Sequence, residues 1–369
     1  MVEKPLDYRD AGVDYAKIDP LKIAAQRAAR DTAANLLRTP YREVEASRGE
    51  SAYVVDMGEF LLASITECLG TKVLIADAMR AVTGKTYFDA IAQDTLAMAI
   101  NDIITVGATP ISVQAYWAAG SSAWFDDAAR AHDLVEGWKA ACNKCGVAWG
   151  GGETPSLGGV VHADTIDLAA SCIGVVRPKE RLTIADKLKP GDAIVLLAAS
   201  GIHANGVSLA RKVAEELPDG YATKISDGRL YGDALLDPTV LYSPVTEALF
   251  AAGIVPHYCA NITGHGWRKV MRHPRALTYR FNKIPAVPPV LAFIQKAARM
   301  SDADAYGTFN MGAGFALFVA AKDAERTVSV ARGAGVDALV AGIVEAGAKQ
   351  VVIEPLGVTF TDADMHLRA

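Results

Sequence analysis

The chain has 369 residues, of which 51% are apolar, and a formal net charge of −5. This length exceeds what one hydrophobic core usually serves, so we expect two domains. The acidic balance and the absence of a Lys/Arg run argue against nucleic acid as the main partner. A small molecule is therefore the expected ligand.

No apolar run reaches the roughly 18 residues that a membrane span needs, and the N-terminus lacks the apolar segment of a signal peptide. We therefore expect a cytoplasmic protein without a membrane partner. The five scattered cysteines fit reduced thiols better than a disulfide framework. Cys142 and Cys145 form a lone CxxC without further ligands nearby, for which helix packing is the simpler explanation than zinc or redox chemistry.

The first half begins with a helix and a strand that leads into a ligand-type loop. Residues 20–37 have apolar positions at helical spacing after a proline, which predicts a helix. The run EFLLASITE at 59–67 predicts a buried strand. It leads to Gly70, Thr71 and Lys72, where the glycine permits a turn and the next two residues offer a hydroxyl and a cation.

Residues 85–102 predict a mostly buried helix that carries acidic and amide side chains. At about 100° per residue, Asp94 and Asn101 share one side of this helix, and Asp102 lies next to Asn101. Globular cores rarely tolerate carboxylates without a partner. Each acid could cap a turn or pair with a lysine, or a divalent metal could hold a polyphosphate there.

Two segments that contain glycine follow this helix in the sequence. Gly107 and Pro110 predict its end, before a strand and a helix at 123–145. The loop WGGGETPSLGG at 149–159 has a bare backbone that a ligand could approach closely, although local sequence favours a hairpin-like turn. Residues 164–176 predict another strand.

Residues 177–192 are charged, contain two prolines and break the apolar pattern, which predicts a domain boundary near Arg177. We therefore divide the chain into an N-terminal domain of residues 1–176 and a C-terminal domain of residues 177–369.

The second half starts with a predicted strand at 193–200, the loop GIHANG at 201–206 and a helix. This order points backbone N–H groups and a helix N-terminus at an anion such as phosphate. Further helices are predicted near 238–252 and 289–299, with a polar glycine turn at 261–266. The order of strands and helices suggests an α/β layer.

Eight motifs resemble, in the same order, those of the aminoimidazole ribonucleotide synthetase family, also called phosphoribosylformylglycinamidine cyclo-ligase. The match is collinear over nearly the whole chain. The motifs are AGVD at 11–14, GTK at 70–72, LAMAIND at 96–102 followed by GATP, GGET at 151–154, GIHANGVSLAR at 201–211, LLDPTVLY at 235–242, ITGHG at 262–266 and TFNMGAG at 308–314. GGET and FNMG point to the cyclo-ligase branch of this ATP-binding superfamily.

The resemblance implies a two-domain α/β (α+β) fold. In it, the N-terminal domain binds ATP and metal, its sheets form a barrel across a homodimer, and the C-terminal domain binds the substrate. The implied reaction is the ATP-dependent ring closure of formylglycinamidine ribonucleotide to aminoimidazole ribonucleotide, ADP and phosphate in purine biosynthesis. In the family, the formyl amide oxygen is phosphorylated, and an amidine nitrogen then attacks that carbon and expels phosphate.

The resemblance also implies site residues, with ATP and Mg²⁺ as cofactors. The expected metal ligands are Glu67, Asp102 and Asn101. The expected ATP-binding residues are Gly70, Thr71, Lys72, Asp89, Asp94, Gly151, Gly152, Glu153 and Thr154. The expected substrate-binding residues are Ser200, Gly201, His203, Asn205, Ser208, Asn261, Thr263 and His265. Catalytic roles are expected for Lys72, His203 and Asn205.

The sequence departs from the family pattern at several of these positions. Glu67 and Cys68 stand in TECLGTK where the family has TDGVGTK. Asn261 and His265 replace a histidine and a glycine, and an acidic residue and methionine become Asp304 and Ala305. Two alternatives therefore stay open: another ATP-dependent phosphotransferase of the superfamily, or a non-catalytic nucleotide-binding paralogue.

Overall fold

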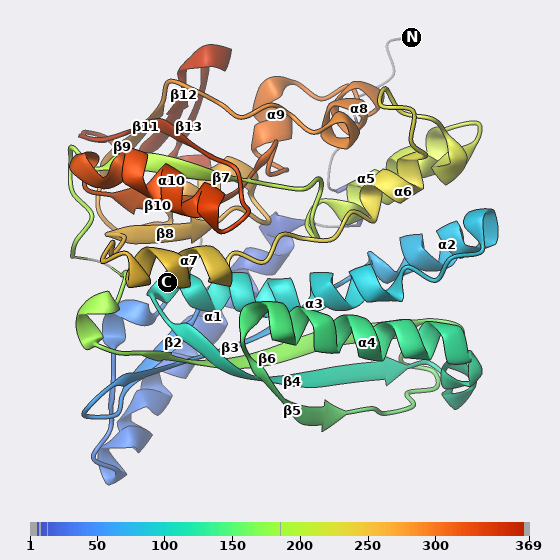
Figure 1. The fold of residues 1–369 in the computed structure, drawn as a ribbon, viewed down its shortest axis with the longest axis horizontal. Coiled ribbons are helices and arrows are strands. Elements are labelled where there is room, and N and C mark those ends of the chain that lie inside the picture. The colour runs from blue at the N-terminus through green and yellow to red at the C-terminus, as the bar shows by residue number, and fades with distance from the viewer. Residues whose placement is uncertain (1–5, 7–8, 13, 185, 365–369) are drawn as a thin grey trace.

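The computed structural model describes residues 6, 9–12, 14–184 and 186–364. It contains two β-sheets, one from each half of the chain, with helices between and beside them (Figure 1). The ends of the two predicted domains, residues 1–5 and 365–369, and Val13 of the AGVD motif lie outside the described residues.

The first sheet has six strands in the order β1-β2-β3-β6-β4-β5. Its strands are β1 (Arg42–Glu43), β2 (Tyr53–Asp56), β3 (Leu61–Cys68), β4 (Thr109–Ala119), β5 (Ala148–Glu153) and β6 (Ile166–Val176). The helices of this half are α1 (Tyr15–Asp31), α2 (Val73–Thr83), α3 (Phe88–Ile103) and α4 (Ala128–Cys145). Neighbouring strands are antiparallel except β4 and β5, which are parallel.

The second sheet has seven strands in the order β13-β12-β9-β11-β7-β10-β8. These are β7 (Ala193–Ala198), β8 (Tyr258–Asn261), β9 (Leu277–Phe281), β10 (Ala313–Val319), β11 (Ala338–Ala346), β12 (Gln350–Ile353) and β13 (Val358–Thr361). Its helices are α5 (Val207–Glu216), α6 (Tyr231–Leu235), α7 (Ser243–Ala251), α8 (Pro289–Ala297), α9 (Asp302–Tyr306) and α10 (Ala324–Gly333). Of its neighbouring pairs, β9 and β12 run parallel and the others antiparallel.

Helix α3 is the predicted acidic helix, and it lies in the interior between the two sheets (Figure 1). It packs against α4, β3 and β6 of its own half and contacts β8 of the other. Gly137 of α4 permits a close approach, since a Cβ there would lie 2.5 Å from the Cα of Asp89. The polar groups of α3 are therefore placed where the two halves meet.

One prediction about local structure is wrong, and one helix is absent from the predictions. The glycines of WGGGET belong to strand β5 rather than to a loop. Gly152 pairs with Ala115 of β4, and a Cβ on it would lie 2.0 Å from the Ala115 carbonyl oxygen, so glycine is what this strand pairing requires. Helix α2, directly after Lys72, was not predicted from the sequence.

Other boundaries shift. The helix predicted for residues 20–37 is α1 followed by a 3₁₀ turn, Thr32–Arg38, and Pro20 lies inside α1 rather than at its start. The helix predicted from residue 238 begins at Ser243, which leaves residues 237–242 as a non-helical segment.

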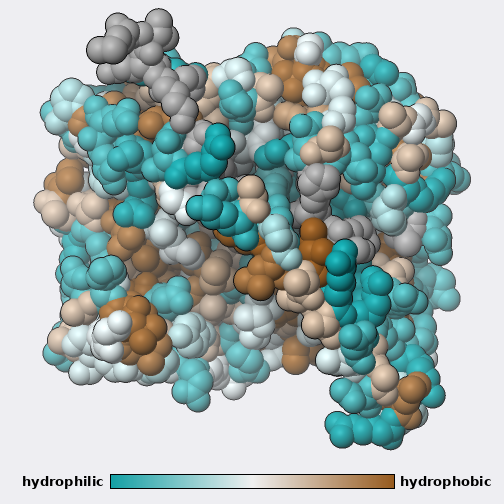
Figure 2. Space-filling model, turned by 180° about the vertical axis from the view of Figure 1, so that it is seen from behind, coloured by the Kyte–Doolittle hydropathy of each residue, from teal (hydrophilic) through white to brown (hydrophobic). Residues whose placement is uncertain are grey.

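In the described part of the chain, one face of the first sheet lacks a covering layer of helices. Helices α3 and α4 lie on one side of its strands, and on the other side the blue segment that contains α1 extends past the sheet near β2 (Figure 1). Ile173 at the centre of β6 is 37% exposed, and it is flanked in register by Ser64 and Ser112. Seen from behind, hydrophobic residues form patches in the lower half of the molecule, at the level of this sheet (Figure 2). Among the described residues, no helix is long and apolar enough to cross a membrane.

Candidate active site

A cavity of about 530 Å³ lies between the two halves of the chain. From the first half it receives Glu67 at the end of β3 and Asp102 at the end of α3. From the second half it receives three predicted substrate residues, Asn205, Thr263 and His265. The fold thus brings predicted metal ligands and predicted substrate residues to one place.

The two carboxylates of this cavity repel each other. Burial, together with the negative charge of Asp102, raises the pKa of Glu67 to about 7. Asp102 accepts a hydrogen bond at Oδ1 from Nδ2 of Asn261, at 2.7 Å. Asn261, predicted to bind substrate, therefore orients Asp102. A site that brings two buried acids close together favours a bound cation.

Basic residues missed in the sequence line the same cavity. Lys269 donates from Nζ to Oγ1 of Thr263 at 2.5 Å. Arg272 donates from Nε to the carbonyl oxygen of Gly49 at 2.9 Å. The two belong to the segment Gly266–Arg272, in which the 3₁₀ geometry is interrupted at Met271, and both line the cavity. The K-x-x-R spacing after ITGHG was the available signal.

His265 replaces a small family residue inside this cavity. Burial, together with the positive charges of Arg268 and Lys269, lowers its pKa to about 3. The imidazole is therefore neutral near pH 7.

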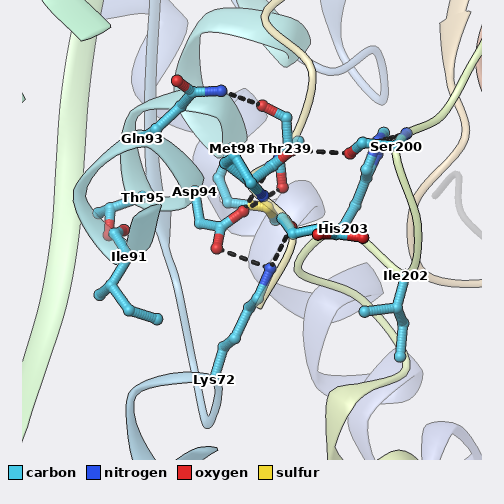
Figure 3. Close-up of polar contacts among 12 residues, drawn as sticks. Lys72, Ile91, Gln93, Asp94, Thr95, Met98, Ser200, Ile202, His203 and Thr239 are labelled. Carbon is cyan, nitrogen blue, oxygen red and sulfur yellow. Dashed lines mark hydrogen bonds and ion pairs between the residues drawn. The ribbon is translucent and has the colours of Figure 1, made fainter. Parts of the chain in front are cut away.

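Lys72 and Asp94 form a buried ion pair outside the cavity lining (Figure 3). Lys72 Nζ lies 2.7 Å from Asp94 Oδ2, and neither side chain has any solvent exposure. Asp94 Oδ1 accepts from the backbone N–H of Thr239 at 2.7 Å and from its hydroxyl at 2.5 Å. Lys72 also donates to the carbonyl oxygen of Asp237 at 3.1 Å. Of the two interpretations of Asp94 left open by the sequence, the structure has the lysine pair.

Asn101 and Gln93 of α3 bind the same segment, residues 237–242. Asn101 donates from Nδ2 to the carbonyl oxygen of Val240 at 2.8 Å and accepts at Oδ1 from the N–H of Tyr242 at 3.0 Å. Gln93 donates to the carbonyl oxygen of Thr239 at 2.7 Å (Figure 3). The structure thus places Asn101 between the halves of the chain and not at the Glu67–Asp102 pair.

The GIHANG loop has only Asn205 in the cavity lining. His203 accepts at Nε2 from the N–H of Ser200 at 3.2 Å, and burial, with a smaller contribution from the charge of Lys72, lowers its pKa to about 3. Ser200 donates from Oγ to the carbonyl oxygen of Pro238 at 2.7 Å (Figure 3). His203 therefore supports the loop from inside, and Gly201, whose carbonyl accepts from Asn310, is buried with it.

The remaining predicted residues are dispersed. Thr71 and Ser208 approach each other, with hydroxyl oxygens 3.3 Å apart. Asp89 lines a second cavity of about 650 Å³, together with Lys85 and Asp133. The predicted ATP-binding residues Gly70, Gly151, Gly152, Glu153 and Thr154 do not line the cavity of Glu67 and Asp102. Asp304, which departs from the family pattern, forms a capping box with Ser301 at the start of α9 and so has a structural role.

Among the residues that the structure describes, no group of three or more His, Cys, Asp or Glu side chains is placed to hold a metal ion. Glu67 and Asp102 are a pair. Mg²⁺ usually takes only one or two carboxylates and completes its octahedron with water and substrate phosphates, so a pair is compatible with Mg²⁺ and not with an all-protein cage.

Comparison with known proteins identifies the family. Models described as AIR synthase related protein, N-terminal domain and C-terminal domain, match residues 49–176 and 189–354. The phosphoribosylformylglycinamidine cyclo-ligase of Methanococcus maripaludis (strain C6) is 32% identical over 340 residues, 92% of this chain and 92% of that protein. That of Methanosarcina barkeri (strain Fusaro) is 32% identical over 359 residues, 96% and 100%.

A solved structure supports the fold. AaThiL complexed with AMPPCP and TMP superposes with a TM-score of 0.58 at 15% identity, covering 89% of this chain and 93% of that chain. The matches of sequence and fold extend over both halves of the molecule, and the chain therefore belongs to the phosphoribosylformylglycinamidine cyclo-ligase family.

Proposed function

We propose that the protein is an ATP-dependent cyclo-ligase that closes the imidazole ring of formylglycinamidine ribonucleotide to give aminoimidazole ribonucleotide, ADP and phosphate. The observation that carries this proposal is the shared cavity, in which Glu67 and Asp102 face Asn205, Thr263 and His265. Ring closure needs a polyphosphate site and an amide site within reach of each other. This cavity combines carboxylates that could hold a metal-bound polyphosphate with amide, hydroxyl and imidazole groups that could bind the reacting amide.

ATP is the proposed phosphoryl donor, and the solved complex of AaThiL with AMPPCP supports a nucleotide in this fold. Glu67 and Asp102 would hold Mg²⁺, which neutralises triphosphate charge when bound. The raised pKa of Glu67 supports this assignment, because a cation would offset both the burial and the charge of Asp102 that raise it.

The protein's own groups position the substrate. The γ-phosphoryl group passes to the formyl amide oxygen, and an amidine nitrogen then attacks the same carbon as phosphate leaves. The amide of Asn205 and the hydroxyl of Thr263 line the cavity and would hydrogen-bond the reacting amide. His203 acts through Ser200 as a positioning residue for this loop, and Lys72 acts through Asp94 on residues 237–242.

We further propose a homodimer that pairs the uncovered faces of the first sheets, with residues 1–176 as the dimerising domain and 177–369 as the substrate domain. The exposed Ile173 in the middle of that face supports the pairing. A cytoplasmic location is supported by five cysteines that are all free thiols.

Growth without purines tests the proposed function. A strain that lacks the synthetase should grow when it carries this chain, and should fail to grow when it carries the Glu67→Gln, Asp102→Asn double variant. Failure of the unmodified, expressed chain would contradict the proposal. In that case ATP hydrolysis with another amide or acid would favour a different phosphotransferase, and nucleotide binding without hydrolysis would favour the non-catalytic paralogue.

A further inference from the structure

Three cationic side chains line the cavity that also contains Glu67 and Asp102. They are Lys22 of α1 and Lys269 and Arg272 of the 3₁₀ segment Gly266–Arg272. None of them was needed to assign the metal pair or the amide site. The lining of the cavity therefore contains both acidic and basic side chains.

Residues at the end of strand β8 and just after it bind both an acidic and a basic side chain of the cavity. Asn261 binds Asp102 at 2.7 Å, and Thr263, two positions later, binds Lys269 at 2.5 Å. Lys269 is hydrogen-bonded to Thr263 and interacts with the charges of Asp102 and Glu67 through space. Lys269 therefore lines the same cavity as the two acids while its hydrogen bond goes to Thr263.

Arg272 is held by hydrogen bonds to residues of the first half of the chain. Its Nε donates to the carbonyl oxygen of Gly49 at 2.9 Å, and its guanidinium donates to Oγ of Ser51 at 2.5 Å. These contacts fix the plane of the guanidinium, so that less side-chain entropy is lost when it binds an anion. Burial lowers the pKa of Lys269, which a bound anion would oppose.

We propose that Lys269, Arg272 and Lys22 form a phosphate subsite across the cavity from Glu67 and Asp102. The subsite deepens the proposed function, on which it rests, because both substrates of the ring closure carry phosphate. The cavity of about 530 Å³ is in the range that accommodates a small phosphorylated molecule. The phosphate can come from the ester of the ribonucleotide or from the end of the nucleotide chain, and the two sources are separable by binding.

Isothermal titration calorimetry on the full chain, without turnover, tests the subsite. The two probes are ribose 5-phosphate, with ribose as its uncharged counterpart, and Mg²⁺-AMPPCP. Lys269→Met should weaken at least one phosphate probe by roughly tenfold or more, which is the effect of one charge-assisted hydrogen bond. Lys269→Arg should retain most of the affinity. Lys296→Met, which removes an exposed lysine of α8, is the matched control and should change neither affinity by more than about twofold.

Selective loss of ribose 5-phosphate assigns the subsite to the ribonucleotide ester, and selective loss of Mg²⁺-AMPPCP assigns it to the nucleotide. If Lys269→Met binds each probe as the unmodified chain does, the subsite is wrong and Lys269 only offsets the nearby acids. If Lys269→Met does not fold, Arg272→Gln carries the same comparison. Phosphate binding that depends on Lys269 in a protein that makes no aminoimidazole ribonucleotide would overturn the proposed function and leave the subsite intact.

Discussion

Lys72 and Asp94 illustrate how the interior of this protein stabilises charge. Both side chains are fully buried, and burial raises the pKa of Asp94 while the Lys72 ammonium lowers it. The buried pair is stabilised by further hydrogen bonds. Oδ1 of Asp94 accepts two from Thr239, and Lys72 donates one to the carbonyl oxygen of Asp237. Removing one partner would leave an uncompensated buried charge, which is far more costly than the pair itself.

Lys72→Met and Asp94→Leu should therefore each destabilise the protein by about 3–5 kcal/mol, and the double variant by clearly less than their sum. The measurement is urea unfolding of the three variants. Lys212→Met, which breaks an exposed pair with Glu215, should leave the free energy of unfolding nearly unchanged. Additive losses in the double variant would show that the two residues act separately.

Glu67 should make the metal-free protein sensitive to pH. Its pKa rises from 4.5 to about 7 on folding, because burial and the charge of Asp102 disfavour the carboxylate. A raised pKa adds stability below about pH 4.5 that is lost as pH rises through about 7, on the order of 3 kcal/mol. Thermal unfolding between pH 5 and about 8 should show this decline, and Glu67→Gln should flatten it.

Lys269, Arg272 and Lys22 also face Glu67 and oppose the effect of Asp102, so the decline should steepen in Lys269→Met. The exposed Glu59→Gln is the control, and its profile should match that of the unmodified chain. A Glu67→Gln profile as steep as the original would show that another group titrates in this range.

At the scale of elements, the close contact of α3 with α4 depends on Gly137. A Cβ at this position would meet the backbone of Asp89 at 2.5 Å, and backbone atoms cannot move aside as a flexible side chain can. Gly333, the last residue of α10, has no atom within 4 Å of its hypothetical Cβ. Gly137 therefore lies inside its helix with backbone atoms close by, whereas Gly333 lies at the end of its helix in open space.

Gly137→Ala should destabilise the protein by about 1–3 kcal/mol through overpacking, although alanine favours helix intrinsically. Gly333→Ala should be neutral or stabilising by up to about 1 kcal/mol. Chemical unfolding of both variants decides the matter. Equal effects would mean that helix propensity alone governs the two positions.

The sequence predicted α3 and β3 because their apolar periodicity is long and regular, and it identified Glu67 and Asp102 from their motifs. It could not reveal β5, because three consecutive glycines carry no strand signal and only the backbone of β4 explains them. Nor could it show that Asp94 faces Lys72, or that Lys269 joins the cavity. Both contacts depend on how segments distant in sequence come together.

At the scale of the whole molecule, α3 binds the two halves together through residues 237–242. Side chains of Gln93, Asp94 and Asn101 contact successive backbone groups of this segment. These contacts fix the position of α3, which also carries Asp102 of the cavity, relative to the second half of the chain.

The homodimer gives a prediction about mass. Light scattering at micromolar concentration should give twice the chain mass of 39.0 kDa, and Ile173→Lys should return the protein to the monomer by placing a charge in the paired face. Val82→Lys, at an exposed apolar position on α2, should leave the mass unchanged. A monomeric unmodified chain would rule out the pairing.

The stoichiometry of the purified reaction tests the ring closure most directly. With Mg²⁺, ATP and formylglycinamidine ribonucleotide, the protein should form ADP, phosphate and aminoimidazole ribonucleotide in equal amounts, and the Glu67→Gln, Asp102→Asn double variant should reduce the rate by roughly a hundredfold or more. Consumption of ATP without formation of aminoimidazole ribonucleotide, or no reaction in a folded protein that binds Mg²⁺-ATP, would contradict it.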